Sequence, residues 1–338
     1  MKSFEWINAQ SVAEAVQLLA TPPAVRDMDE APRPIAGGQD LLTTMKDYLT
    51  RPARLVNLKT VRGLDRIEGN AKTGLRIGAL VTLAQLEENP VVRRSFPGLA
   101  EAAHSIATPQ IRNLGTVGGN LCQRPRCWYY RLEEAFCLKK GGSECFAATG
   151  ENKYNAILGG GPSYIVHPSD LAPMLVALGA SVSVTGGEGK KVIPLEKFFT
   201  LPSEGSIRRE NILKNEELVT EIQIPASGFA GRSTYLKFKE RESMDFALAS
   251  VAAAVELQEN KIIKQARLVL GGVAPIPWRV ANAEKFLAGK SLSAEVLTEV
   301  ARLALEGAQP LEKNAYKIPL TQTLVRRALT QAVNGTTN

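Results

Sequence analysis

We expect no segment that marks the chain for a membrane or for export. No apolar run approaches the roughly 20 residues that span a bilayer, and the N-terminus, MKSFEWINAQSVAEAVQLLA, lacks the apolar centre of a secretory signal. The Arg-Arg pairs are all internal, so none acts as a twin-arginine export signal. We therefore expect a cytoplasmic protein by its own sequence, which becomes periplasmic only if a partner subunit exports it already folded.

Histidines, basic runs and acid–base motifs are also scarce. The 338 residues include only two histidines, His104 and His167, and no obvious nucleophile or acid–base pair, so no catalytic residue is predicted. A net charge of +7 without a run of five basic residues argues against direct nucleic-acid binding and fits docking to acidic partner proteins. The length and an apolar content of 44% predict two globular domains.

Cysteine is absent outside residues 122–145, CQRPRCWYYRLEEAFCLKKGGSEC, which hold Cys122, Cys127, Cys137 and Cys145. Thiolates are soft ligands that suit zinc and iron–sulfur clusters. The spacing matches neither a ferredoxin nor a zinc ribbon with paired C-x-x-C knuckles. The residues alone therefore leave an iron–sulfur cluster, structural zinc, disulfides and unligated thiols open, and the missing export signal counts against disulfides.

Periodicity and turn residues predict an α+β protein with a domain boundary near residue 228, in the linker ASGFAGR. Ser11 with Glu14, and Thr82 with Gln85, form capping-box patterns at expected helix starts. Capping patterns and apolar spacing predict helices over 12–19, 41–45, 99–107, within 167–180 after Ser169 or Asp170, and over 279–307 and 318–333. Strands are expected at 34–36, 53–59, 74–80, 181–186 and 217–225, with a β-rich stretch over 233–273 that turns near Asn260. Residues 108–121 are predicted to form turns.

Two glycine-rich turns suggest a phosphate-binding site. AGGQDLL (36–42) lies between a predicted strand and a helix start, and GTVGGN (115–120) is a second candidate. Glycine lets the backbone approach a ligand closely, and free amides at a helix start bind phosphate. Asp170 in HPSD either caps a helix or accepts hydrogen bonds from a ribose. Each signal alone is more often a plain turn or cap, but together they suggest a dinucleotide.

Several stretches, in the right order, resemble the FAD-binding subunit of the molybdenum hydroxylases, the medium-subunit family of xanthine dehydrogenase and carbon monoxide dehydrogenase. They are PIAGGQDLL, RIGALVTLAQLE, TPQIRNLGTVGGNL, HPSDLAP, EIQIP and ARLVLGGVAPIPWR, and the resemblance extends from about Phe4 to Leu329. The cysteines make the chain most similar to the [4Fe–4S]-containing FAD subunits of periplasmic-type aldehyde oxidoreductases. The resemblance implies a two-subdomain FAD-binding fold of the vanillyl-alcohol-oxidase (PCMH) type over 1–226, with a cysteine-rich insertion at about 122–162. A C-terminal α+β domain, like that of carbon monoxide dehydrogenase flavoproteins, would follow over 227–338.

The resemblance also implies the cofactor contacts. The first glycine loop would wrap the FAD diphosphate with its main chain, through Pro34, Ile35, Ala36, Gly37, Gly38, Gln39, Asp40, Leu41 and Leu42. Further FAD contacts would come from Thr108, Gly115, Thr116, Gly119 and Asn120, from Asp170 at the adenosine ribose, and from Val219 and Lys237 near the flavin. The cluster ligands would be Cys122, Cys127, Cys137 and Cys145. Cluster-bearing relatives often have a cysteine just before HPSD, where this chain has Ser163, so the fourth ligand would be Cys122 or a group other than cysteine, unless three cysteines hold the cluster.

The implied function is electron transfer within a heterotrimer. A large subunit would bind the molybdenum cofactor and oxidise an aldehyde or heterocycle, and a small subunit would carry two [2Fe–2S] clusters. The present chain, with FAD and the [4Fe–4S] cluster, would pass the electrons to an external acceptor. A stand-alone flavin-dependent oxidoreductase and a zinc-binding structural module are the alternatives.

Overall fold

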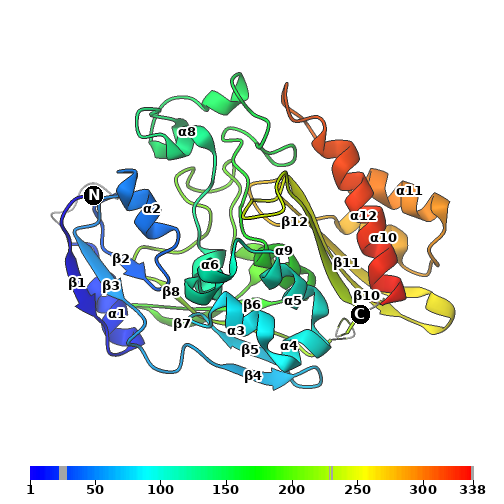
Figure 1. Cartoon of the computed structure of the whole chain (residues 1–338), viewed down its shortest axis with the longest axis horizontal. Helices are drawn as coiled ribbons and strands as arrows, with labels where there is room; N and C mark the ends of the chain where they lie inside the picture. Colours follow the sequence, from blue (N-terminus) through cyan, green and yellow to red (C-terminus); the bar gives the residue numbers. More distant parts are fainter. Residues whose placement is uncertain (23–28, 228, 230, 336–338) are drawn as a thin grey trace.

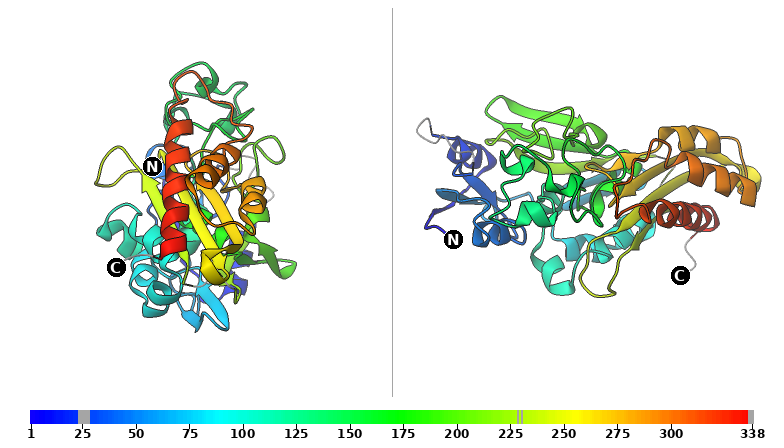
Figure 2. Two further views of the ribbon diagram at one scale, coloured as in Figure 1. Left: turned by 90° about the vertical axis from the view of Figure 1, so that its right-hand side faces the viewer. Right: turned by 90° about the horizontal axis from the view of Figure 1, so that it is seen from above.

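The computed structural model of the chain describes residues 1–22, 29–227, 229 and 231–335, and the strands in these residues form three sheets (Figure 1). The first sheet lies at one end of an elongated molecule, and the C-terminal helices lie at the other end (Figure 2). In the same residues, no helix combines the length and apolar character needed to cross a membrane. The mixture of sheets and helices confirms the predicted α+β class. The predicted boundary in ASGFAGR includes residues 228 and 230, which lie outside the described residues.

The first sheet is small and parallel. Its strands, in spatial order, are β1 (Glu5–Asn8), β3 (Arg54–Asn57) and β2 (Arg33–Ile35). Two helices accompany them, α1 (Val12–Leu19) and α2 (Leu41–Lys46). Ser11 Oγ accepts a hydrogen bond from the Glu14 amide at 3.1 Å, so the predicted cap is present and α1 has the predicted bounds.

The second sheet is antiparallel and supports the main core. Its strands, in spatial order, are β4 (Ile67–Asn70), β5 (Gly74–Gly78), β8 (Leu218–Ile224), β6 (Ser181–Gly186) and β7 (Gly189–Pro194). The helices that pack with it are α3 (Leu83–Glu88), α4 (Pro90–Ser95), α5 (Pro97–His104), α7 (Val117–Leu121) and α9 (Leu171–Ala177). Thr82 and Gln85 form the predicted reciprocal capping box of α3.

The third sheet belongs to the C-terminal part of the chain. Its strands, in spatial order, are β12 (Trp278–Arg279), β11 (Ile263–Gly271), β10 (Ala249–Leu257) and β9 (Ser233–Phe238), and its helices are α10 (Ala281–Leu287), α11 (Ala294–Leu303) and α12 (Lys317–Asn334). Alternate residues of β10 face opposite sides, because side chains alternate along a strand. Val251 packs in the core under these helices, whereas Ala252 packs in the main core. β10 is therefore buried on both faces, which accounts for its continuous apolar sequence.

Two segments differ from the sequence prediction. Residues 108–121, predicted as turns, form two short helices, α6 (Pro109–Leu114) and α7, because Thr108 and Thr116 each cap a helix start. The single helix predicted over 279–307 is divided into α10 and α11 near Gly289, which has a φ of +76°. The cysteine window, residues 122–145, contains α8 (Trp128–Arg131) and the 3-10 turn Leu138–Lys140, and it lies on the same side of the molecule as α2 (Figure 1). A second 3-10 turn, Phe146–Ala148, follows it directly.

Candidate functional site

The two predicted glycine loops lie against each other. A Cβ atom on Gly37, between β2 and α2, would be 2.1 Å from the Leu114 carbonyl oxygen and 3.0 Å from the Cα atom of Gly115. The next residue, Gly38, has a φ of +70°, which glycine adopts without strain. The close approach of the two loops therefore depends on a residue without a side chain at position 37.

The second glycine loop is anchored on the segment that precedes α3. The amides of Val117 and Gly118 donate to the carbonyls of Val81 and Ala79, each at 2.9 Å. The hydroxyl of Thr116 accepts from the Gly119 amide at 3.2 Å and so caps α7. The stretches GALVT and GTVGGN, separate in the sequence, are thus one structural unit.

Ser169 ties the HPSD segment to this unit. Its hydroxyl donates to Asn120 Oδ1 at 2.5 Å and accepts from the Ala172 amide at 3.0 Å. Of the two residues proposed as the cap of α9, Ser169 is therefore the one that makes the capping bond. The side chain of Asp170 makes none and is left for another role.

The carboxylate of Asp170 is buried and is bound by two side chains of β9. Lys237 Nζ and the Tyr235 hydroxyl donate to its two oxygens, each at 2.7 Å, and Lys237 also donates to the Ser105 carbonyl at 3.1 Å. The two residues predicted near the ribose and the flavin thus form one buried ion pair. Tyr235 was missed by the sequence analysis, although strand periodicity places it on the same face as Lys237.

Two other predicted FAD contacts are engaged in the fold. Val219 lies opposite Val184 in the second sheet and packs in the main core. The hydroxyl of Thr108 accepts from the Ile111 amide at 3.4 Å at the start of α6. Direct contacts therefore join the two glycine loops to each other, Ser169 to Asn120, and Lys237 to Asp170. Val219 and Thr108 instead make their contacts within the sheet and the helix that contain them.

The cysteine window does not bring all four thiols together. Cys137 is buried in a small apolar cluster with Leu49, and Cys127 packs against the same cluster. Cys145 interacts electrostatically with Cys127. Cys122 packs instead against the main core, where burial and the charge of Glu210 raise the pKa of its thiol to about 12. All four thiols are free of disulfides, and no group of three or more His, Cys, Asp or Glu side chains among the described residues is arranged to hold a metal ion.

The sulfur of Cys127 is surrounded by hydrogen-bond donors. Asn155 Nδ2 lies 3.7 Å from it, and the backbone amides of Tyr130 and Tyr129 also donate to it. Burial raises the pKa of this thiol, and the three donors lower it in part. N–H···S bonds of this kind stabilise thiolates and commonly surround the sulfur ligands of metal centres.

Arginines from the cysteine window approach the first glycine loop. Arg126 Nη2 and Arg131 Nη2 lie 3.0 and 2.7 Å from the carboxylate of Asp40. Within the described part of the chain, Arg126 Nε and Arg131 Nη1 are buried without a hydrogen-bond partner. A cavity of about 300 Å³ begins beside Arg126 and Cys127 and extends to Asp170. Buried guanidinium donors beside a glycine loop fit an anionic cofactor such as a dinucleotide diphosphate.

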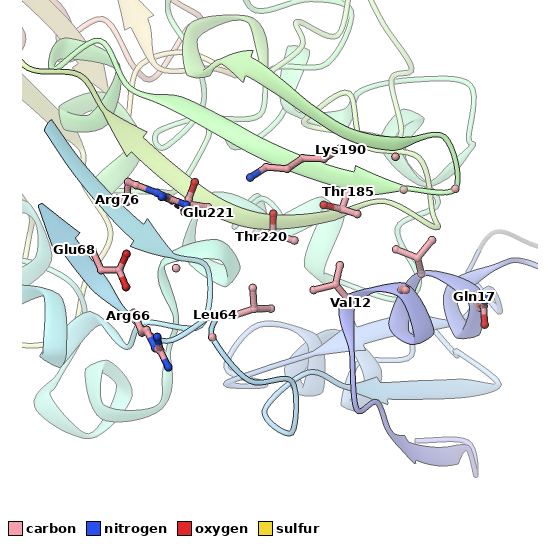
Figure 3. A pocket seen from close by; sticks show the side chains of 17 residues that line it. Val12, Gln17, Leu64, Arg66, Glu68, Arg76, Thr185, Lys190, Thr220 and Glu221 are labelled. Atoms are coloured by element: carbon pink, nitrogen blue, oxygen red, sulfur yellow. Dashed lines mark hydrogen bonds and ion pairs between the residues drawn. The ribbon is translucent and has the colours of Figure 1, made fainter. Parts of the chain in front are cut away.

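A larger cavity, of about 760 Å³, lies between α1 and the second sheet (Figure 3). Charged residues on its walls include Arg66, Arg76, Lys190 and Glu221, and Arg76 pairs with Glu221 at 2.6 Å. None of the predicted FAD contacts lines this cavity. We therefore place the candidate cofactor site at the glycine loops, where the close backbone approach and the buried donors occur, and not in the larger cavity.

Two family models match the chain. Residues 2–227 match the FAD-binding domain in molybdopterin dehydrogenase, and residues 233–332 match the C-terminal domain of CO dehydrogenase flavoproteins. The chain belongs to the FAD-binding subunits of the molybdenum hydroxylase family. This confirms the family resemblance inferred from the glycine, HPSD and C-terminal motifs.

Similar members of this FAD-subunit family have been characterised or solved. The chain is 33% identical over 335 residues to the aldehyde oxidoreductase FAD-binding subunit PaoB of Escherichia coli K12, covering 98% of this chain and 99% of that protein. Carbon monoxide dehydrogenase of Hydrogenophaga pseudoflava contains a similar chain, with a TM-score of 0.74, 27% identity, and coverage of 98% and 97% of the two chains. The reconstituted CO dehydrogenase of Oligotropha carboxidovorans contains another, with a TM-score of 0.75, 26% identity and 99% coverage of both chains.

As a member of this FAD-subunit family, the chain is an oxidoreductase subunit that binds FAD. The contact between the glycine loops and the unpaired arginine donors fit that cofactor. The sequence analysis assigned no contacts to the arginines of the cysteine window, because their partners, Asp40 and Glu210, lie far away in the sequence.

Proposed function

We propose that the chain is the electron-transfer subunit of a heterotrimeric molybdenum hydroxylase and that it holds a [4Fe–4S] cluster in addition to FAD. It would receive electrons from a molybdenum-cofactor large subunit through a small subunit with two [2Fe–2S] clusters, and would pass them to an external acceptor. An aldehyde or a heterocycle would be the substrate of the large subunit. The name of the E. coli relative, an aldehyde oxidoreductase FAD-binding subunit, supports the aldehyde class.

The two histidines of the chain, the side chains that most often act as acid or base near neutral pH, are held in an ion pair or buried. His104 Nδ1 is paired with Glu87 at 2.7 Å on an exposed surface. Burial lowers the pKa of His167 to about 4, so this side chain is neutral near pH 7. FAD supplies the exchange between two-electron and one-electron steps, and the protein holds it in position.

The surroundings of Cys127 are the observation that carries the cluster proposal. Its sulfur receives N–H donors from Asn155 and from two backbone amides, within the one window that contains every cysteine of the chain. Lys139 and Lys140 interact electrostatically with Cys137. Amide donors and cations offset the negative charge of a thiolate-ligated cluster and raise its reduction potential.

We assign Cys127, Cys137 and Cys145 as cluster ligands, with Cys122 as the fourth. Cys122 would have to turn away from the main core to reach the other three. Four single Cys→Ser variants test this ligand set. We expect loss of iron from each variant, and a Cys122→Ser variant with full iron content would require a different fourth ligand.

Anaerobic purification of the chain with its partner subunits, followed by separation, tests the proposal directly. We expect FAD together with iron and acid-labile sulfide in the stoichiometry of one [4Fe–4S] cluster, and an electron paramagnetic resonance signal after reduction. Zinc without iron or flavin would support a structural module instead. Reduction of the flavin by substrate in the absence of the other subunits would support a stand-alone oxidoreductase.

A further inference from the structure

The cavity of about 300 Å³ that reaches Asp170 has a buried floor and an open mouth. Asp170 and Ser250 lie at the floor and are only 5% and 1% exposed. Trp128 and Phe246 lie at the opening, where they are 57% and 39% exposed. The floor belongs to the candidate cofactor site, because Asp170 is one of the predicted FAD contacts. The opening is the part that remains for a molecule that arrives from solvent.

Three aromatic residues from separate segments line this opening. Trp128 begins α8, Tyr154 follows the cysteine window, and Phe246 lies in the connection between β9 and β10. The rings of Trp128 and Tyr154 meet edge to face, with their centroids 5.3 Å apart. Large aromatic side chains that stay exposed beside a pocket are typical of a ligand-binding surface. We call these three residues the aromatic opening, and their rings suit a flat molecule.

The charged side chains at the opening are held in ion pairs. Lys153 pairs with Glu240, which also accepts from the Tyr154 hydroxyl at 2.7 Å, and Arg241 Nε lies 3.7 Å from the carboxylate of Asp245. In the part of the chain that the structure describes, three cationic and four acidic side chains line the whole cavity. A diphosphate is bound by cations that are free to pair with it. The charges at the opening therefore select against a dinucleotide.

Arg126 marks the limit between the opening and the first glycine loop. Its Nη2 lies 3.0 Å from the carboxylate of Asp40, and its guanidinium lies over Phe246, 4.8 Å from the ring centroid. Its Nε is buried, so this donor is not presented to solvent at the opening. The two ends of the cavity thus suit different chemistry, an anionic group beside the glycine loop and an uncharged aromatic group at the opening.

We propose that the aromatic opening binds the external electron acceptor and that this acceptor is an uncharged quinone. The inference rests on the proposed function, because that function requires an acceptor that takes electrons from FAD. Quinones combine the three properties that the opening and this function require, since they are flat, uncharged and reducible. A quinone takes up the two electrons and two protons that are released when FADH2 is oxidised to FAD, and it leaves as the hydroquinone.

The first measurement is the binding of menadione, a methylnaphthoquinone, to the oxidised, FAD-loaded full chain by isothermal titration calorimetry. We expect saturable binding that is tighter than the binding of NADH. Trp128→Ala removes one ring from the opening and should raise the dissociation constant for menadione by about 2- to 10-fold, the usual effect of losing one aromatic pair. Phe246→Leu keeps an apolar side chain without a ring, and it should raise the dissociation constant by a similar factor.

Trp6 provides a matched control. It is 50% exposed, close to the exposure of Trp128, but it belongs to β1 and is not among the residues that line the cavity. Trp6→Ala should therefore keep the wild-type affinity for menadione, whereas nonspecific adsorption to exposed tryptophans would be reduced in both alanine variants. Trp128→Phe retains a ring at the opening and should recover most of the affinity that Trp128→Ala loses.

The second measurement follows the electrons. FAD in the full chain is reduced anaerobically with dithionite, the excess is removed, and stopped-flow absorbance records the reoxidation of the flavin by menadione. We expect the rate to saturate as the menadione concentration rises, because the quinone binds before it is reduced. In Trp128→Ala, half-saturation should move to a higher concentration by the same factor as the dissociation constant.

Two results would overturn the inference and leave the proposed function intact. One is a complex whose flavin is reduced through the partner subunits but which binds no menadione, or binds it equally well in Trp128→Ala and Phe246→Leu. The other is NADH binding that is tighter than menadione binding and is weakened by the same variants. A chain that binds menadione as expected, but whose flavin the partner subunits never reduce, would instead refute the proposed function and leave the aromatic opening as a ligand site.

Discussion

Replacing Gly37 with alanine tests whether the contact between the two glycine loops forms the FAD site. The new Cβ atom would lie 2.1 Å from the Leu114 carbonyl oxygen, whereas ordinary van der Waals contact begins at 3.4 Å, so the loops must separate by more than about 1 Å. Overpacking of this kind typically costs about 1 to 3 kcal/mol. If the displaced loop carries that cost when FAD is bound, the dissociation constant should rise by about 5- to 150-fold.

The assay is a fluorescence titration of the FAD-free chain with FAD, combined with thermal unfolding. We expect the Gly37→Ala variant to lose most of its FAD during gel filtration and to unfold a few degrees below the wild type. Gly187→Ala is the control, because a Cβ atom there meets no atom within 4 Å and its φ is not left-handed. Wild-type FAD affinity in the Gly37→Ala variant would refute the view that this close approach shapes the site.

Three further predictions concern buried charge and the cluster. Burial lowers the pKa of Lys317 from 10.5 to about 7, so between these two pH values the side chain is neutral in the folded chain and charged in the unfolded chain. Unfolding therefore takes up a proton in this pH range, and wild-type stability should rise with pH by up to about 1.4 kcal/mol per unit. The stability of Lys317→Met, measured by denaturant unfolding at about pH 7.5 and about pH 9.5, should not show this rise. Lys139→Met should destabilise the chain by about 3 kcal/mol, because it leaves the buried Glu210 with one cationic partner fewer. Denaturant unfolding measures this loss, and an unchanged unfolding midpoint would show that the ion pair makes no net contribution to stability. Cys137→Ser should lose iron but keep FAD, measured by metal and flavin content, and retention of iron would remove Cys137 from the ligand set.

The elements that the sequence predicts well are those with local causes. The helix over 12–19 has its cap, its apolar face and its end within a few residues of each other, and its predicted bounds match the structure. The capping box at Thr82 is similarly local. The error over 108–121 arose because the glycines were given more weight than Thr108 and Thr116, although each threonine lies three residues before the amide it caps.

The candidate site was predictable only where a motif carries it. Backbone loops that bind phosphate need glycine, so the two glycine loops are visible in the sequence. The partners of charged side chains are not visible in this way. Asp40 and Arg131 are 91 residues apart, and Lys237 and Asp170 are 67 residues apart, so only the fold reveals these pairs. For the same reason, cysteine spacing could not show that Cys122 packs in a different core from Cys127 and Cys137.

The charges around the cysteine window indicate how this region is stabilised. Burying cations is costly unless carboxylates and carbonyl oxygens pair with them. Here Arg126 and Arg131 pair with Asp40, while Arg124 and Lys139 pair with Glu210. Because these pairs do not involve the thiols, they can hold the window in place before any metal binds. We therefore expect the iron-depleted chain to keep its window folded and the Cys127 thiol protected from alkylation, whereas rapid alkylation of Cys127 after chelation would show that the metal, and not the ion pairs, holds the window together.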